Sequence, residues 1–143
     1  MKKTILFIII GIVVIFVAAS VVINGRAHTN PPVIAEPQWD SPQTRELASR
    51  ACFDCHSNET VWPWYSYFPP ASNIVLRDVV EGRKRLNFSE WGTRRFDEPW
   101  EISEVIAEGR MPPKVYLPLH PKANLTQAEK QELIRGFQAT FNK

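Results

Sequence analysis

Both cysteines of this 143-residue chain lie in one pentapeptide, Cys52-Phe53-Asp54-Cys55-His56. This C-x-x-C-H pattern is the attachment signature of c-type haem. Two thiols on one helical turn can reach the two vinyl groups of a single porphyrin and form thioethers. The histidine after the second cysteine then lies beneath the iron, where its imidazole can be the proximal ligand. We therefore expect one covalent haem c, held by Cys52 and Cys55, with His56 on the iron.

Other uses of the two cysteines fit less well. A structural zinc site needs four ligands, and His28 and His120 do not complete a finger spacing. A thioredoxin-like pair would need a βαβ pattern around it, which is missing. A disulfide is compatible with an oxidising compartment, but it does not explain why a histidine follows the second cysteine at position 56.

An uncharged apolar run, Ile5 to Ile23, is interrupted only by Gly11 and Ser20. As a helix it would span roughly 28 Å, close to the hydrocarbon thickness of a bilayer. Lys2 and Lys3 precede it and favour a cytoplasmic N-terminus, although Arg26 follows it. A cleaved signal peptide is the rival interpretation, with small residues for cleavage at Val17-Ala18-Ala19.

The length of the run favours an uncleaved signal-anchor at residues 1–24. The expected location is a single pass through a bacterial cytoplasmic membrane, with the soluble domain in the periplasm. Without Lys2, Lys3 and Arg26, 14 basic residues face 15 acidic ones. This balance does not favour nucleic-acid binding. The local cluster Arg83-Lys84-Arg85 is expected to be a solvated helix end.

The remaining chain predicts a proline-rich tether at 25–40 and an all-α domain at 41–143. Ser41-Pro42 predicts a helix start that leads into Cys52, and the apolar spacing predicts a second helix over 72–85. A third helix is expected from Asp97-Glu98-Pro99 to Gly109. The capping box Thr126-Gln127-Ala128-Glu129 starts a fourth, which ends near Phe141. The hydrophobic core of so small a domain usually needs an additional stabilising group, and a buried haem would supply one.

The expected distal iron ligand is Met111, in the stiff segment Gly109-Arg110-Met111-Pro112-Pro113. Its rival as a ligand is His120, although a loop histidine bonded to backbone or to a haem propionate is the favoured interpretation of that residue. Arg110 and Lys114 flank the methionine and are candidates for pairing with the propionates. The predicted haem pocket consists of aromatic residues: Trp62, Trp64, Tyr65, Phe68 and Tyr116.

The soluble part resembles the bacterial haem-binding domain family of monohaem periplasmic proteins. The resemblance covers roughly residues 40–141. Three features match: the C-x-x-C-H motif with Ser57-Asn58, the run Trp62-Pro63-Trp64-Tyr65, and Met111-Pro112-Pro113 followed by Tyr116 and His120-Pro121. It implies a cytochrome c-like fold, with Cys52, Cys55 and His56 as haem attachment and proximal ligand. It also supports Met111 as the distal ligand.

A closed iron site of this kind suits a one-electron carrier rather than an enzyme. Redox proteins of the membrane or periplasm would then be the partners. Two alternatives stay open at this point. One is a haem-based sensor or gas-binding module in which Met111 leaves the iron or never binds it. The other is an interaction domain of a membrane complex, in which the haem serves only to stabilise the fold.

Overall fold

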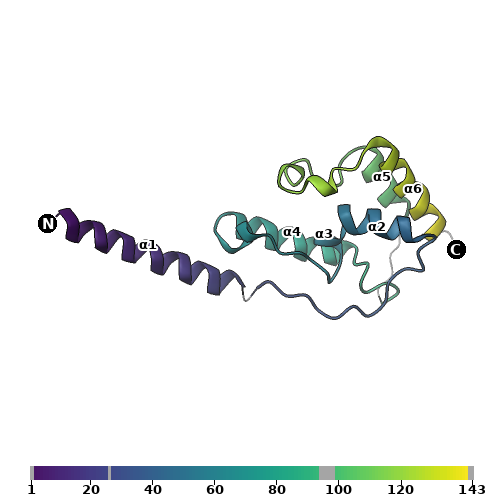
Figure 1. Ribbon diagram of the computed structural model, residues 1–143. Coiled ribbons are helices and arrows are strands. Elements are labelled where there is room, and N and C mark those ends of the chain that lie inside the picture. The colour runs from purple at the N-terminus through teal and green to yellow at the C-terminus, as the bar shows by residue number, and fades with distance from the viewer. Residues whose placement is uncertain (1, 26, 94–98, 142–143) are drawn as a thin grey trace.

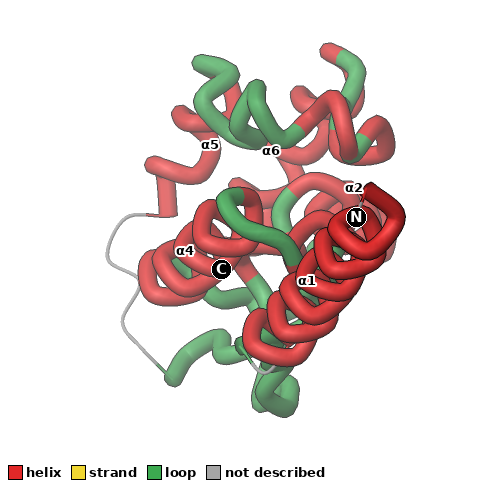
Figure 2. The backbone as a smooth tube through the Cα atoms, turned by 90° about the vertical axis from the view of Figure 1, so that its left-hand side faces the viewer, coloured by secondary structure: helices red, strands yellow, loops and turns green. Residues whose placement is uncertain are grey.

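The computed structural model describes residues 2–25, 27–93 and 99–141, and these ranges contain helices and loops but no β-strand (Figure 2). The helices are α1 (Lys2–Gly25), α2 (Pro42–Ala51), α3 (Phe53–His56), α4 (Ala71–Arg85), α5 (Pro99–Ala107) and α6 (Gln127–Phe141). Short 3-10 turns occur at η1 (Trp64–Tyr67), η2 (Leu117–Leu119) and η3 (Pro121–Ala123). The all-helical prediction with an N-terminal apolar helix is confirmed.

Helix α1 projects away from the remaining helices, which pack together at its C-terminal end (Figure 1). Within it, Lys3–Val22 is long and apolar enough to cross a membrane by length and composition. Its large side chains are exposed along its length, from Ile5 to Val22. An exposed apolar helix of this length is typical of a membrane span or a signal sequence. Arg26, the predicted charge after the run, lies outside the described residues.

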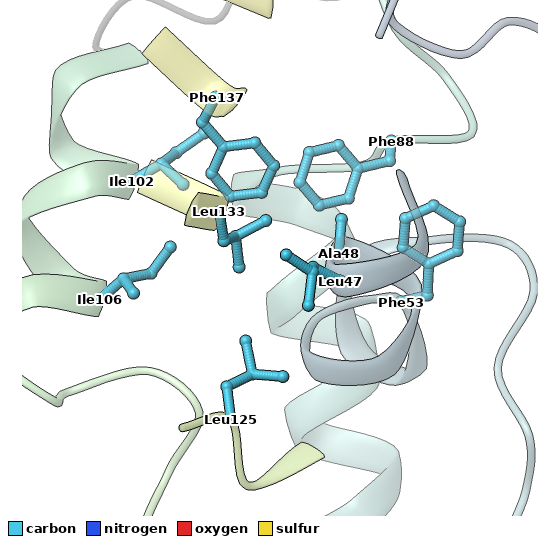
Figure 3. Close-up of a cluster of buried hydrophobic side chains, with 9 residues drawn as sticks. All are labelled: Leu47, Ala48, Phe53, Phe88, Ile102, Ile106, Leu125, Leu133 and Phe137. Carbon is cyan, nitrogen blue, oxygen red and sulfur yellow. The ribbon is translucent and has the colours of Figure 1, made fainter. Parts of the chain in front are cut away.

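The core forms where α2, α5 and α6 meet (Figure 3). Helices α2 and α6 approach closely because Gly136 has no side chain: a Cβ atom there would lie 2.1 Å from Oγ1 of Thr44. Around this crossing, buried apolar side chains from α2, α3, α5, α6 and two loops pack together: Leu47, Ala48, Phe53, Phe88, Ile102, Ile106, Leu125, Leu133 and Phe137. Phe53, inside the C-x-x-C-H motif, is therefore also a core residue.

Residues 27–41 include most of the predicted tether at 25–40 and run along the domain (Figure 1). The amides of Ile34 and Ala35 donate to the Ser89 carbonyl at 2.8 and 3.2 Å, and Trp39 packs against the core. The Glu36 carboxylate accepts two bonds from the Arg45 guanidinium, at 2.7 and 2.6 Å. We call residues 27–41 the strap, because backbone bonds and an ion pair hold it against the domain.

The predicted helices in the soluble part are present. Ser41 caps α2, its hydroxyl accepting from the Thr44 amide at 3.1 Å. Helix α4 begins one residue before the predicted start, and Gly109 follows α5 with a φ of 69°, as a residue at the C′ position requires. Asp97 and Glu98, predicted to open the third helix, lie outside the described residues. The 3-10 turns were not predicted, because one turn of helix leaves too short a periodic pattern.

The capping box at the start of α6 is present in both directions. The Thr126 amide donates to Oε2 of Glu129 at 2.7 Å, and the Glu129 amide donates to Oγ1 of Thr126 at 3.2 Å. The Arg50 guanidinium donates to the same carboxylate at 2.8 Å and so ties α2 to α6. The backbone bond from Thr126, together with Arg50, lowers the pKa of Glu129 to about 2.

This carboxylate makes a pH-dependent contribution to stability. Because its folded pKa is lowered, the contribution is present above the unfolded pKa, about 4.3, and is lost as the pH falls toward 2. Glu129→Gln keeps a side-chain acceptor for the Thr126 amide but does not ionise. We therefore expect the melting temperature of the wild type to fall more steeply than that of Glu129→Gln between pH 4.5 and pH 2. Thermal unfolding across that range measures the difference, and parallel curves would contradict it.

Candidate haem-binding site

The motif occupies one helical turn at the end of α2. The Cys52 amide donates to the Ala48 carbonyl at 2.8 Å, as the last bond of α2. The Cys52 carbonyl then accepts from the amides of Cys55 and His56, at 3.2 and 2.9 Å. The two cysteines and the histidine therefore share one turn, formed by Cys52 and the α3 helix that it precedes, as the spacing predicts. Both thiols are free and partly buried.

The His56 ring is oriented by backbone carbonyls of α4. Its Nδ1 lies 3.1 Å from the Gly82 carbonyl and 3.2 Å from the Leu86 carbonyl. A carbonyl only accepts, so Nδ1 carries the proton and donates. Within the described residues no hydrogen bond uses Nε2, which is left with its lone pair. A backbone bond at one ring nitrogen is how proteins commonly orient a histidine that binds metal through the other.

Burial keeps this imidazole neutral. It lowers the pKa of His56, and this effect outweighs the two backbone bonds, which raise it. The neutral form is the one that can bind iron, because the imidazolium has no free lone pair.

Gly82 sets the distance between α3 and α4. A Cβ atom at this position would lie 2.3 Å from the Cys55 carbonyl oxygen and 3.0 Å from its carbon. Any side chain would therefore overlap the backbone of the motif. The same residue supplies one of the two carbonyls that orient His56. Sequence reasoning missed Gly82, because a glycine inside a helix pattern carries no sign of what it packs against.

The thiols are poor candidates for a zinc site. Burial raises the pKa of Cys52 to about 12 and that of Cys55 to about 11. At neutral pH both free thiols are therefore protonated. No group of three or more histidine, cysteine or acidic residues that could hold a metal ion occurs among the described residues. Two neutral thiols and one free imidazole nitrogen are instead the groups that a haem c attachment site uses.

A hydrogen-bonded group of aromatic residues lies beside the motif. The Tyr116 hydroxyl donates to Oδ2 of Asp54 at 2.5 Å, and Oδ1 of the same carboxylate accepts from the Val61 amide at 2.9 Å. The His120 ring stacks on Tyr116, with centroids 3.8 Å apart. Burial, followed by the bond to Asp54, raises the pKa of Tyr116 above its ordinary value. Asp54 was not predicted as a site residue, because the two middle positions of C-x-x-C-H are not set by haem attachment.

His120 uses both ring nitrogens inside the protein. Its Nδ1 lies 3.0 Å from the Tyr116 carbonyl, and its Nε2 lies 3.4 Å from the Tyr65 hydroxyl. This agrees with the interpretation of His120 as a loop histidine bonded to backbone. Met111, by contrast, follows α5 and is 38 % exposed, and its amide donates to the Val105 carbonyl at 3.1 Å. Ligation by either residue stays a prediction.

The predicted aromatic pocket divides into two parts. Tyr65 and Tyr116 lie with His120 beside the motif. The Trp64 ring meets the Tyr65 ring edge-on at 5.9 Å between centroids and lies 6.4 Å from the Phe68 ring, although Trp64 is 76 % exposed. Trp62 instead stacks on His28 of the strap at 4.2 Å between centroids. The roles of these aromatic residues in a haem pocket stay predictions. Of the two suggested propionate partners, Arg110 forms an ion pair with Glu108 at 2.5 Å, and the role of Lys114 likewise stays a prediction.

Arg83 was expected to belong to a solvated helix end, and for this residue the expectation is wrong. Its guanidinium donates to the Ser57 carbonyl at 2.7 Å, directly after the motif. It also donates to the Thr29 carbonyl at 2.9 Å and to Oδ1 of Asn30 at 2.8 Å, both in the strap. Arg83 therefore joins α4, the haem motif and the strap. Sequence alone does not distinguish it from its exposed neighbour Lys84, since both are cations on one helix.

We expect Arg83→Met to release the N-terminal part of the strap. The stability loss should be about 1 kcal/mol, since charge-assisted bonds are lost at a site that is only partly buried. Proteolysis within residues 27–35 should become faster, because the Thr29 carbonyl and the Asn30 side chain lose their donor. Limited proteolysis with a protease that does not cleave at arginine or lysine, followed by mass spectrometry, measures the cleavage rate in this segment. Lys84→Met, the same change on the exposed neighbour, is the control, and equal cleavage of both variants would contradict the role of Arg83.

Comparison with known proteins gives one family. Residues 9–139 match the model of the haem-binding domain family. No curated protein and no solved structure matched the chain. The match spans most of the chain and includes the C-x-x-C-H motif, the His56 contacts on α4 and the Tyr116–His120 group. The chain therefore belongs to the haem-binding domain family.

Proposed function

We propose that this protein is a monohaem c-type cytochrome, a one-electron carrier whose haem is covalently attached to Cys52 and Cys55. The observation that carries the proposal is the state of His56. Its Nδ1 donates to two carbonyls of α4, and its Nε2 is left free on the same helical turn as two free thiols. When bound, a haem supplies a one-electron iron couple.

The residues of the chain have distinct roles in this proposal. Cys52 and Cys55 hold the porphyrin through thioethers. His56 binds the iron from the proximal side, and its bonds to the Gly82 and Leu86 carbonyls increase the basicity of the imidazole and fix its orientation. The half-buried rings beside the motif would limit access of water, which disfavours the more highly charged oxidised iron.

We assign Met111 as the distal ligand. His120 is the less suitable residue, because both of its nitrogens already have partners on Tyr116 and Tyr65. Met111 is the sole methionine after Met1, and the Val105 carbonyl holds its amide at the end of α5. Two protein ligands would close the iron site, which suits outer-sphere electron transfer with redox partner proteins.

In the same proposal α1 anchors the protein in the bacterial cytoplasmic membrane, with the domain in the periplasm. The exposed apolar span Lys3–Val22 supports the anchor. Lys2 and Lys3, at the N-terminal end of this span, support the orientation by the positive-inside rule. Export also agrees with the motif, because haem c attachment takes place outside the cytoplasm.

Visible spectroscopy of the purified full-length protein tests the ligands. A methionine–iron bond gives oxidised c-type cytochromes a weak band near 695 nm, and we expect Met111→Ala to abolish it and to lower the midpoint potential. His120→Ala is the matched control and should keep the band. If the reduced wild type binds carbon monoxide at once, the iron site is open, and the gas-binding or sensor function replaces the carrier function.

A further inference from the structure

Tyr116 ties the segment that follows α5 to the turn that contains the haem motif. Its hydroxyl donates to Oδ2 of Asp54 at 2.5 Å, across 62 residues of chain. Tyr116 is half-buried, whereas Lys114 and Val115 beside it are exposed. The contact with the motif is therefore made by the side chain of Tyr116 rather than by its neighbours.

Asp54 is held in place at the other end of this bond. It lies between Cys52 and Cys55 in the motif turn, and its Oδ1 accepts from the Val61 amide at 2.9 Å. Its backbone carbonyl accepts from the Thr60 hydroxyl at 2.8 Å. Because these bonds fix both the backbone and the carboxylate, the acceptor for Tyr116 is a rigid part of the turn that would hold the porphyrin.

A short and stiff piece of chain joins Tyr116 to Met111. The Met111 amide donates to the Val105 carbonyl of α5 at 3.1 Å, and the Tyr116 amide donates to the Pro113 carbonyl at 2.9 Å. Pro112 and Pro113, which lie between them, each have a φ angle fixed by the ring. Few backbone angles are therefore free between the two residues, and the position of Tyr116 limits where Met111 can lie.

We propose that the hydrogen bond between Asp54 and Tyr116 positions Met111 for the iron, which makes Tyr116 a positioning residue for this distal ligand. The inference rests on the proposed assignment of Met111. One end of the bond is on the turn that would hold the porphyrin, and the other end is on the segment that carries the distal ligand. For Met111 to leave the iron, the segment has to move away from the turn, and the bond to the charged carboxylate opposes this movement.

Competition with imidazole in the oxidised, full-length, haem-loaded protein tests the proposal. Imidazole binds the iron only where Met111 has left it, and the loss of the methionine–iron band follows its binding. Tyr116→Phe keeps the ring but removes the hydroxyl. We expect it to bind imidazole about tenfold more tightly than the wild type, which corresponds to about 1.4 kcal/mol.

Tyr65→Phe is the matched control for this measurement. It removes a hydroxyl from the same aromatic group, but that hydroxyl lies 3.4 Å from Nε2 of His120 and does not bond to the motif turn. Its affinity for imidazole should stay close to that of the wild type.

Substitution of the acceptor separates the hydrogen bond from the charge of Asp54. Asp54→Asn can still bond to both partners, because its carbonyl accepts from the Val61 amide and its NH2 donates to the phenol oxygen of Tyr116. It should therefore bind imidazole like the wild type, whereas Asp54→Ala should resemble Tyr116→Phe. The double variant Asp54→Ala, Tyr116→Phe should bind imidazole no more tightly than Asp54→Ala, since both changes remove the same bond.

Hydrogen exchange of residues 111–117 in the same loaded protein gives a second measurement. We expect faster exchange in Tyr116→Phe than in Tyr65→Phe, because the segment has lost its bond to the motif turn. Asp54→Ala keeps the complete Tyr116 side chain, so both measurements can be made on it if Tyr116→Phe folds poorly.

Three results would overturn the proposal. The first is an equal affinity for imidazole in the wild type, Tyr116→Phe and Asp54→Ala. The second is an Asp54→Asn variant that behaves like Asp54→Ala, which would assign the effect to the charge. The third is equal exchange of residues 111–117 in the two tyrosine variants. Failure of the proposed Met111 ligation is seen separately, in the wild type alone, as the lack of the methionine–iron band before imidazole is added.

Discussion

Replacing Cys52 and Cys55 together by alanine is expected to abolish covalently bound haem. Both thioethers are lost, and His56 alone binds iron reversibly, so the haem should leave when the protein is denatured. The full-length protein, produced with a c-type maturation system, is run on a denaturing gel and stained for haem peroxidase activity. The wild-type band should stain and the double variant should not, at equal amounts of protein.

Ser49→Ala is the control for this experiment. Ser49 lies on α2 just before the motif, and its hydroxyl bonds only to the Glu46 carbonyl of its own helix. It should stain as strongly as the wild type. A stained double variant would show that haem is attached elsewhere. If the wild-type band does not stain although the protein binds haem before denaturation, the haem is not covalently attached. The chain would then be a haem-binding protein, and the covalent attachment that we propose would be wrong.

The second large effect is expected for Gly82→Ala. The added Cβ atom would overlap the Cys55 carbonyl at 2.3 Å, and this partner is backbone, which cannot turn aside as a side chain can. Overpacking of this kind costs about 3 kcal/mol, and the better helix propensity of alanine returns roughly 1 kcal/mol. The net loss of about 2 kcal/mol corresponds to a melting temperature lower by about 10 °C for a domain of this size.

Two comparisons separate the backbone overlap from a general effect of substitution in a helix. Glu81→Ala, at the exposed neighbouring position of α4, should leave the melting temperature almost unchanged. Gly136→Ala overlaps the side chain of Thr44 instead, at 2.1 Å from Oγ1. Combining it with Thr44→Ala should therefore recover part of the loss, as a double-mutant cycle would measure. An unchanged melting temperature for Gly82→Ala would refute the close approach of α3 and α4.

Much of the site could be predicted, because its chemistry is local in sequence. The C-x-x-C-H spacing places two thiols and an imidazole on one turn whatever the rest of the chain does, and α3 has that turn. The start signals at Ser41 and Thr126 act within three residues, and both caps are present as hydrogen bonds. The apolar span from Ile5 to Ile23 is equally local, since an apolar run of about this length favours a helix on its own.

What the motif could not reveal is which groups surround it, because these come from residues distant in the chain. The orientation of His56 depends on carbonyls 26 and 30 residues away. The bond between Asp54 and Tyr116 spans 62 residues, and Arg83 meets the strap 54 residues before it. Such contacts follow from packing and leave no periodic pattern. Composition and spacing therefore predicted a haem attached beyond an apolar helix. Only the folded chain determines which nitrogen of His56 is free, because backbone carbonyls of α4 occupy Nδ1 and leave Nε2.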